Sequence, residues 1–156
     1  MRLTPADTLE RLKAIAAGTE DRAARAKDAA ECIRQARQFR WVGLYDVTSS
    51  EIRAIAWTGT NPPAYPTFPR TQGLNGAAVA EGRPVIINDV RKDSRYLTTF
   101  AATLAEAIVP VRVGDTIVGT LDVESDRVDA FTPDDERFLR QCAGAIAPLW
   151  SPHAAW

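Results

Sequence analysis

The chain has 156 residues, 46% hydrophobic and 25% charged, a composition typical of one folded domain rather than of a disordered segment. Its formal net charge of −1 favours neither nucleic acid nor an anionic membrane as a partner. Two cysteines and one histidine are too few for a disulfide framework or a histidine-rich metal site, so we expect no cofactor. Free thiols, and the absence of a secretory signal or a long apolar run, predict a cytoplasmic protein.

The first forty residues are predicted to be helical. Thr4 and Pro5 open a helix that Gly18 ends, and a second helix follows over about residues 20–37. Its apolar positions are mostly alanine, which permits close helix packing, and its basic residues alternate with acids as on a solvated face. We expect residues 1–38 to be N-terminal helices packed on a sheet.

The pattern then changes to period two. Residues 41–47 and 51–57 read as two strands of a hairpin, with the turn at 48–50. Four prolines within residues 58–72 predict a long ordered loop, and loops of this length in compact domains are often functional.

Further elements follow in chain order. Residues 76–81 indicate a short helix, residues 85–87 a buried strand, and residues 88–105 a segment that is irregular at first and then helical. Two apolar runs, 107–113 and 116–125, form a hairpin around a Gly-Asp turn. Thr132 and Pro133 begin a final helix, which completes an α+β domain.

Alternation along residues 116–125 separates two faces. The apolar set, expected to pack on the helices, is Ile117, Gly119, Leu121 and Val123, and the opposite set is Val118, Thr120, Asp122 and Glu124. The two carboxylates either meet water or lie in a pocket covered by residues 58–72 and 88–105. In a pocket they would repel each other and lose hydration, and an ammonium group on a ligand would relieve both costs.

Other residues with chemical potential have ordinary structural interpretations. Trp41 and Tyr45 share one face of a strand, where they either pack in the core or form the wall of a ligand pocket. Cys142 lies on the apolar stripe of the last helix, as a buried structural thiol does. His153 belongs to a terminal tail, residues 151–156.

Together these segments resemble a GAF domain, and most of all the free methionine-R-sulfoxide reductases of that fold, from Trp41 to about Leu139. The matching segments are Trp41–Tyr45, Gly73–Gly76, Ile87–Val90, Glu106–Pro110, Gly119–Glu124 and Phe131–Glu136. The resemblance implies a central antiparallel sheet of five to six strands, with the N- and C-terminal helices on one face and a loop-covered pocket on the other. It places the GAF domain at residues 39–150.

The resemblance also implies binding residues. The family holds its substrate with a Trp and a Tyr on the first strand, a Glu before the last hairpin and two acids at the far end of that hairpin. Those places are occupied here by Trp41, Tyr45, Glu106, Asp122 and Glu124. Only Glu124 departs from the pattern, because the family has Asp there.

The family's three cysteines are absent. Their places are held by Tyr65, Asn75 and Thr99, which become candidate ligand-binding residues. Sulfoxide reduction in this family needs a thiolate to attack sulfur and a second thiol to resolve the adduct, and a threonine hydroxyl cannot replace it. Since Cys32 and Cys142 lie away from the predicted pocket, the resemblance implies a related cavity without the reaction.

The last hairpin contains a geometric conflict. A two-residue turn at Gly114–Asp115 with unbroken pairing places Ala107 opposite Asp122, so Glu106 faces away from the pocket. A bulge at Pro110, or a strand that begins after Glu106, would return Glu106 to the pocket, and we expect one of the two.

Three functions remain open. The leading hypothesis is a non-catalytic GAF domain, sensory or regulatory, that binds a small polar amine-bearing metabolite. The second is an enzyme like the free methionine-R-sulfoxide reductases with unconventional thiols. The third is a dimerisation module with a vestigial pocket, since GAF domains commonly form homodimers through helices like these.

Overall fold

The computed structural model describes residues 3–98 and 100–150. Its helices are α1 (Pro5–Ala16), α2 (Arg22–Arg37), α3 (Gly73–Glu81) and α4 (Pro133–Ile146), with the short 3₁₀ turns η1 (Val90–Lys92) and η2 (Ala147–Leu149). Its strands are β1 (Trp41–Val47), β2 (Glu51–Thr58), β3 (Thr67–Pro69), β4 (Val85–Ile87), β5 (Ala105–Val113) and β6 (Thr116–Ser125). They form one antiparallel sheet in the order β3-β2-β1-β6-β5-β4.

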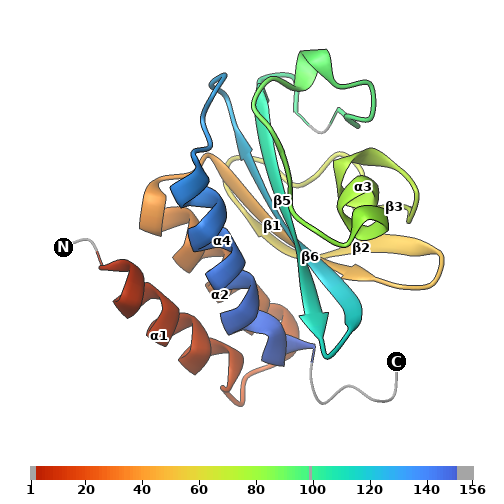
Figure 1. Cartoon of the computed structure of the whole chain (residues 1–156). Helices are drawn as coiled ribbons and strands as arrows, with labels where there is room; N and C mark the ends of the chain where they lie inside the picture. Colours follow the sequence, from red (N-terminus) through yellow and green to blue (C-terminus); the bar gives the residue numbers. More distant parts are fainter. Residues whose placement is uncertain (1–2, 99, 151–156) are drawn as a thin grey trace.

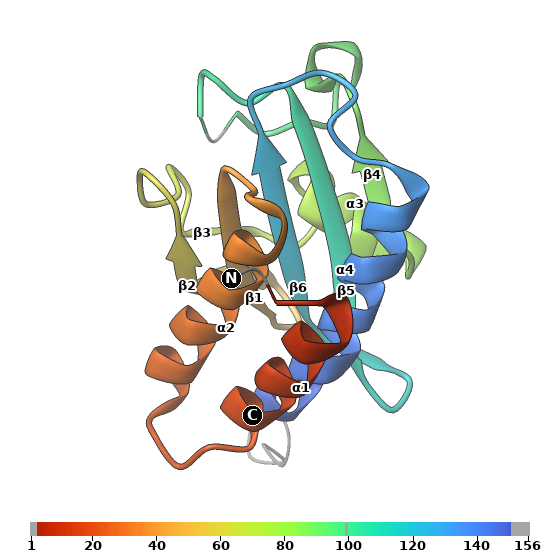
Figure 2. The same cartoon turned by 90° about the vertical axis from the view of Figure 1, so that its left-hand side faces the viewer.

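The helices lie on both faces of this sheet. Helices α1, α2 and α4 cover one face, and α3 with the long loops covers the other (Figures 1 and 2). The main core lies between the sheet and the first group, where Leu12, Ile33, Leu121 and Leu139 are fully buried. This is the predicted α+β architecture, with six strands. None of the described helices is long and apolar enough to cross a membrane.

Both expected helix starts are confirmed. Thr4 and Thr132 each cap a helix through a reciprocal pair of bonds with the aspartate three residues later, and a proline occupies the first helical turn in both cases. Three acids in the first turn of α4 complement the positive end of its dipole.

Three local expectations are corrected. The proline-rich segment 58–72 contains the edge strand β3, in which Pro69 is tolerated because one side of an edge strand needs no ladder bond. Helix α3 begins at Gly73 rather than residue 76. In the described part of residues 88–105 no α-helix forms: η1 is a single 3₁₀ turn followed by irregular chain.

A bulge in β6 changes the predicted alternation. Val111 pairs with Gly119 and Arg112 with Ile117, which leaves Val118 as the extra residue. Ile117 therefore packs on the face of the sheet that α3 covers, and Val118 packs on the face that α1, α2 and α4 cover. Both placements are the reverse of the expectation.

The same bulge resolves the conflict in the last hairpin. Beyond it, Ile108 rather than Ala107 lies opposite Asp122, and Glu106 lies opposite Glu124. A bulge was expected at Pro110, whereas the extra residue is on the partner strand. The alternative of a strand beginning after Glu106 is wrong, because β5 starts at Ala105.

Candidate functional site

Three carboxylates meet on the α3 side of the sheet, and we call Glu106, Asp122 and Glu124 the carboxylate cluster. Glu106 and Glu124 are cross-strand partners on β5 and β6, and Asp122 is two residues from Glu124 on the same face. One oxygen atom from each lies within 4.8 Å of the other two. Their exposed fractions are 4%, 2% and 0%, so the cluster is removed from water.

Two aromatic side chains of β1 form a wall beside the cluster. Trp41 and Tyr45 are buried at either side of Gly43, and Gly43 pairs with Asp122 on β6. A Cβ atom at Gly43 would overlap the Trp41 ring and lie 3.2 Å from Tyr45 Cε1. Glycine at this position therefore lets the two rings close over the strand.

Four residues contact the aromatic wall from outside the sheet, and we call them the cover: Asn61, Phe68, Leu97 and Phe100. The Trp41 indole N–H donates to the Asn61 carbonyl oxygen at 2.9 Å. The Trp41 and Phe100 rings meet edge-on at 5.4 Å, and the Tyr45 and Phe68 rings at 5.9 Å. Leu97 packs with the same apolar group.

The space left beside the cluster is small. The cavity bounded by Tyr45, Tyr65, Asn75, Glu106 and Asp122 has a volume of about 10 Å³. That is room for about one water molecule, far below the roughly 300 Å³ at which small-molecule pockets begin. A ligand of metabolite size therefore does not fit beside the cluster in this conformation.

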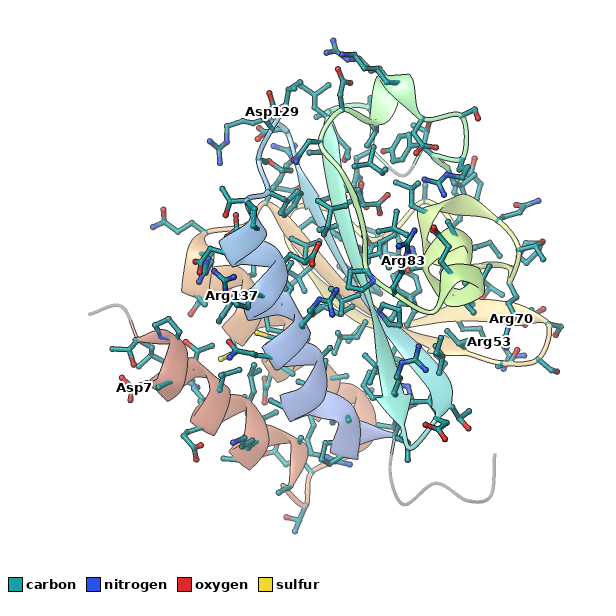
Figure 3. The ribbon with its side chains drawn as sticks, in the orientation of Figure 1. Asp7, Arg53, Arg70, Arg83, Asp129 and Arg137 are labelled. Carbon is teal, nitrogen blue, oxygen red and sulfur yellow. The ribbon has the colours of Figure 1, made fainter. Side chains whose placement is uncertain are left out.

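No positive side chain of a described residue forms an ion pair with the cluster. Among the described residues, none of the ion pairs involves Glu106, Asp122 or Glu124. Arg53 and Arg83, which are labelled in Figure 3, are exposed and pair with Glu51 and Glu81. Buried carboxylates without a cation are costly in the charged form.

The pKa values of the cluster reflect this cost. Burial, and then the charge of Asp122, raises the pKa of Glu124 from 4.5 to about 9. Burial also raises the pKa of Glu106 well above its usual value, with the charges of Asp122 and Glu124 adding to the shift. Burial raises the pKa of Asp122, whereas hydrogen bonds from Glu106 and Asn75 oppose that shift.

Hydrogen bonds around the cluster are unevenly distributed. Asn75 Nδ2 donates to Asp122 Oδ2 at 3.0 Å, and Thr120 Oγ1 donates to Asn75 Oδ1 at 2.6 Å. Thr103 and Tyr96 lie near Glu124 and favour its charged form. Neither oxygen of Glu124, nor Asp122 Oδ1, forms a hydrogen bond of normal geometry with any described residue.

Most of the predicted site residues come together. Seven of the eight, namely Trp41, Tyr45, Tyr65, Asn75, Glu106, Asp122 and Glu124, belong to the cluster, to its aromatic wall or to the cavity lining. Tyr65 is 46% exposed and lies at the outer edge. Thr99 lies outside the described residues.

Sequence reasoning missed several contributors. Thr120 had a signal, because it shares a strand face with Asp122, but it was assigned no role. Phe68, Phe100 and Thr103 lie in the two segments that were expected to cover the pocket, but no pattern within those segments indicated which residues meet the site.

The carboxylate cluster can present negatively charged oxygen atoms to a cationic ligand. Three carboxylate oxygens form the one such set of potential metal ligands among the described residues, and hard cations take oxygen ligands of this kind. An ammonium group can use the same atoms as hydrogen-bond acceptors.

The two cysteines lie on the opposite face of the sheet. Cys142 is buried in the helical core, and Cys32 packs partly exposed against the same core. Burial, and then the nearby Cys32, raises the pKa of Cys142 to about 12. Burial also raises the pKa of Cys32. Neither thiol is therefore activated, and neither belongs to the site.

The family model described as "GAF domain" matches residues 16–150. The chain belongs to the GAF domain family. This match extends beyond the sheet to include α2, and the residues of the cluster, its wall and its cover all fall within it.

This GAF domain is similar both to a protein named for the GAF domain and to proteins named as reductases. It is 26% identical over 134 residues to GAF domain-containing protein A of Dictyostelium discoideum, covering 85% of this chain and 84% of that protein. It is 29% identical over 108 residues to free methionine-R-sulfoxide reductase of Escherichia coli, covering 69% and 64%. A free methionine-R-sulfoxide reductase from Neisseria meningitidis, solved with its substrate, superposes with a TM-score of 0.84 at 24% identity, covering 94% and 87%.

Proposed function

We propose that this GAF domain is a non-catalytic sensory or regulatory module that binds a small polar metabolite carrying an amine. The observation that carries the proposal is a buried carboxylate cluster with no cationic partner among the described residues. An ammonium group placed there gains charge-assisted hydrogen bonds and removes the cost of burying unpaired carboxylates. The aromatic wall supplies an apolar surface for the rest of the ligand.

We expect no sulfoxide reduction because of the positions and the pKa values of the two cysteines. Positions that carry cysteines in the reductase family hold Tyr65, Asn75 and Thr99. Both cysteines of this chain lie on the opposite face of the sheet from the cluster, and burial raises their pKa values. Relatives named as reductases favour the enzyme as the alternative. A coupled assay with free methionine sulfoxide separates the two: we expect no turnover, and turnover abolished by Cys142→Ser would support the enzyme instead.

Binding is tested with matched ligands. Free amino acids and methionine sulfoxide are compared with their N-acetylated forms by thermal shift and calorimetry. We expect at least one free amine to raise the melting temperature and its acetylated form to have no effect, because acetylation removes the positive charge. Equal shifts from both forms would contradict the proposal, as would no shift across the whole panel.

Variants then assign the site. Asp122→Asn keeps the shape of the side chain and removes its charge, so we expect roughly 10- to 100-fold weaker binding of the amine identified by that panel. The control is Glu10→Gln on the outer surface of α1, where the side chain is 76% exposed, and we expect it to bind unchanged. Unchanged affinity in Asp122→Asn would remove the cluster from the proposal.

A further inference from the structure

A buried chain of two hydrogen bonds reaches only one member of the carboxylate cluster. Thr120 on β6 contacts Asn75 on α3, and Asn75 contacts Asp122. All three side chains are buried, with exposed fractions of 0%, 6% and 2%. These three side chains therefore form no hydrogen bond with bulk water. The direction in which each hydrogen bond donates is set by Thr120, Asn75 and Asp122 themselves.

The two distances indicate the direction of the chain. Thr120 Oγ1 and Asn75 Oδ1 are 2.6 Å apart, a separation typical of O–H···O, whereas Asn75 Nδ2 and Asp122 Oδ2 are 3.0 Å apart, as in N–H···O. The hydroxyl donates to the amide oxygen, and the amide nitrogen then faces the carboxylate. Because an amide N–H can only donate, Asp122 Oδ2 must accept, which favours the ionised form of Asp122.

The other two members of the cluster have the opposite surroundings. An oxygen atom of Glu106 lies within 4.8 Å of an oxygen atom of Asp122, and both side chains are buried. Two charged carboxylates at this distance repel each other, so a charged Asp122 favours a protonated Glu106 beside it. Glu124 has no hydrogen bond of normal geometry to either oxygen from a described residue. Thr103 and Tyr96 lie near Glu124 and favour its charged form, but full burial is the larger effect and favours the neutral form.

The remaining groups that face the cluster supply no positive charge. Tyr45 comes from β1, Tyr65 from the segment before β3 and Tyr96 from the segment after η1, and all three are phenols. Helix α3 contributes the neutral Asn75. Arg95, in the same segment as Tyr96, is paired with Asp93 and Glu81 rather than with the cluster. Protons must therefore balance most of the charge of the cluster.

We propose that the Thr120–Asn75 chain makes Asp122 the single ionised member of the carboxylate cluster, so that the site selects a ligand with one positive charge. Thr120 and Asn75 are positioning residues in this scheme. The ligand's ammonium group takes the place beside Asp122 Oδ1, while Glu106 and Glu124 keep their protons. A divalent metal ion would require the loss of a further proton from a buried glutamate. The choice of ligand rests on the proposed function, whereas the charge assignment does not.

The charge assignment is tested without a ligand, by NMR of protein with ¹³C-labelled Asp and Glu carboxyl groups between pH 5 and 10. At pH 7 we expect Asp122 ionised and Glu106 and Glu124 protonated, with the signals assigned through Asp122→Asn, Glu106→Gln and Glu124→Gln. Thr120→Val should raise the pH at which Asp122 ionises by about one to two units, and Thr120→Ser should restore it. A protonated Asp122 at pH 7, or the same titration in Thr120→Val and wild type, would overturn the assignment.

The selectivity is tested on the same labelled protein. Methylammonium should shift the Asp122 signal at pH 7 and leave both glutamates protonated, whereas calcium at equal concentration should not. Tighter binding of calcium, or release of a proton from a glutamate with methylammonium, would overturn the selectivity. If no amine binds while Asp122 alone is ionised, the proposed function fails and the charge assignment is supported.

Discussion

Replacing Glu124 with glutamine is expected to stabilise the fold at neutral and alkaline pH. Burial raises the pKa of Glu124 from 4.5 to about 9, so the folded protein holds a proton that the unfolded chain releases above about pH 4.5. A group whose pKa is raised on folding contributes its full stability below the unfolded value and loses it as the pH rises to the folded value. The window for Glu124 is therefore from about 4.5 to about 9.

The magnitude follows from the width of that window. Each pH unit inside it lowers the free energy of unfolding by about 1.4 kcal/mol, which gives about 3 kcal/mol at pH 7 relative to a side chain that never ionises. This is an upper limit for Glu124→Gln, because the glutamine amide must itself find hydrogen-bond partners in the site.

Urea unfolding followed by tryptophan fluorescence at pH 5, 7 and 9 measures the effect. We compare the free energy of unfolding of Glu124→Gln with that of the wild type at each pH. The difference, variant minus wild type, should be smallest at pH 5 and should increase at pH 7 and again at pH 9. Glu10→Gln, on a side chain that is 76% exposed, should show no such increase. A difference that does not change with pH would mean that Glu124 is ionised in the folded protein, and would refute the reasoning.

Three further outcomes are expected. Gly43→Ala should cost about 1–3 kcal/mol in stability and change tryptophan fluorescence, because the added methyl group displaces the Trp41 ring. Trp41→Phe removes the hydrogen bond to Asn61 and should make residues 59–66 more sensitive to limited proteolysis, with the melting temperature as a check on global unfolding. Cys32 and Cys142 should react with a disulfide reagent more slowly than free cysteine at pH 7, and at the free rate after denaturation, because burial raises both pKa values.

Periodicity and capping signals predict the regular parts of this fold well. Strands β1, β4 and β6 match their expected bounds, because each is a run of apolar or alternating residues between turn signals. Helices α1 and α4 begin where a threonine and a proline predicted them. Such signals depend on residues that are close together in the sequence, so they can be recognised without knowledge of the tertiary structure.

The errors arise where distant segments decide the outcome. Strand β3 forms because residues 67–69 reach the free edge of β2, which no local pattern in the proline-rich segment reveals. The bulge at Val118 depends on how β5 and β6 fit together over their whole length. The bulge expected at Pro110 therefore lies on the partner strand, and the alternative of a strand that begins after Glu106 does not occur. The two segments that supply the cover were expected to lie over the pocket, whereas the particular residues that contact Trp41 and Tyr45 depend on how distant parts of the chain meet.

The candidate site was predictable in its membership but not in its electrostatics. Strand alternation and the family resemblance together identified Asp122 and Glu124, and the structure adds that Glu106 is opposite Glu124. Whether a carboxylate is charged depends on its burial and on the donors that face it. The donor that faces Asp122 is the Asn75 amide of α3, which no strand pattern indicates, and Thr120, on the same strand face as Asp122, donates to that amide.

Strand β6 links the stability of the fold to the charge of the site. On one face Leu121 and Val123 are fully buried against the helices, so the strand cannot shift without opening the main core. On the other face that rigidity holds Asp122 and Glu124 together although they repel when charged. A flexible loop would separate the carboxylates until each reached water. The packing of the helices therefore keeps three acids close together in a buried place, where protons and a bound cation together must balance their charge.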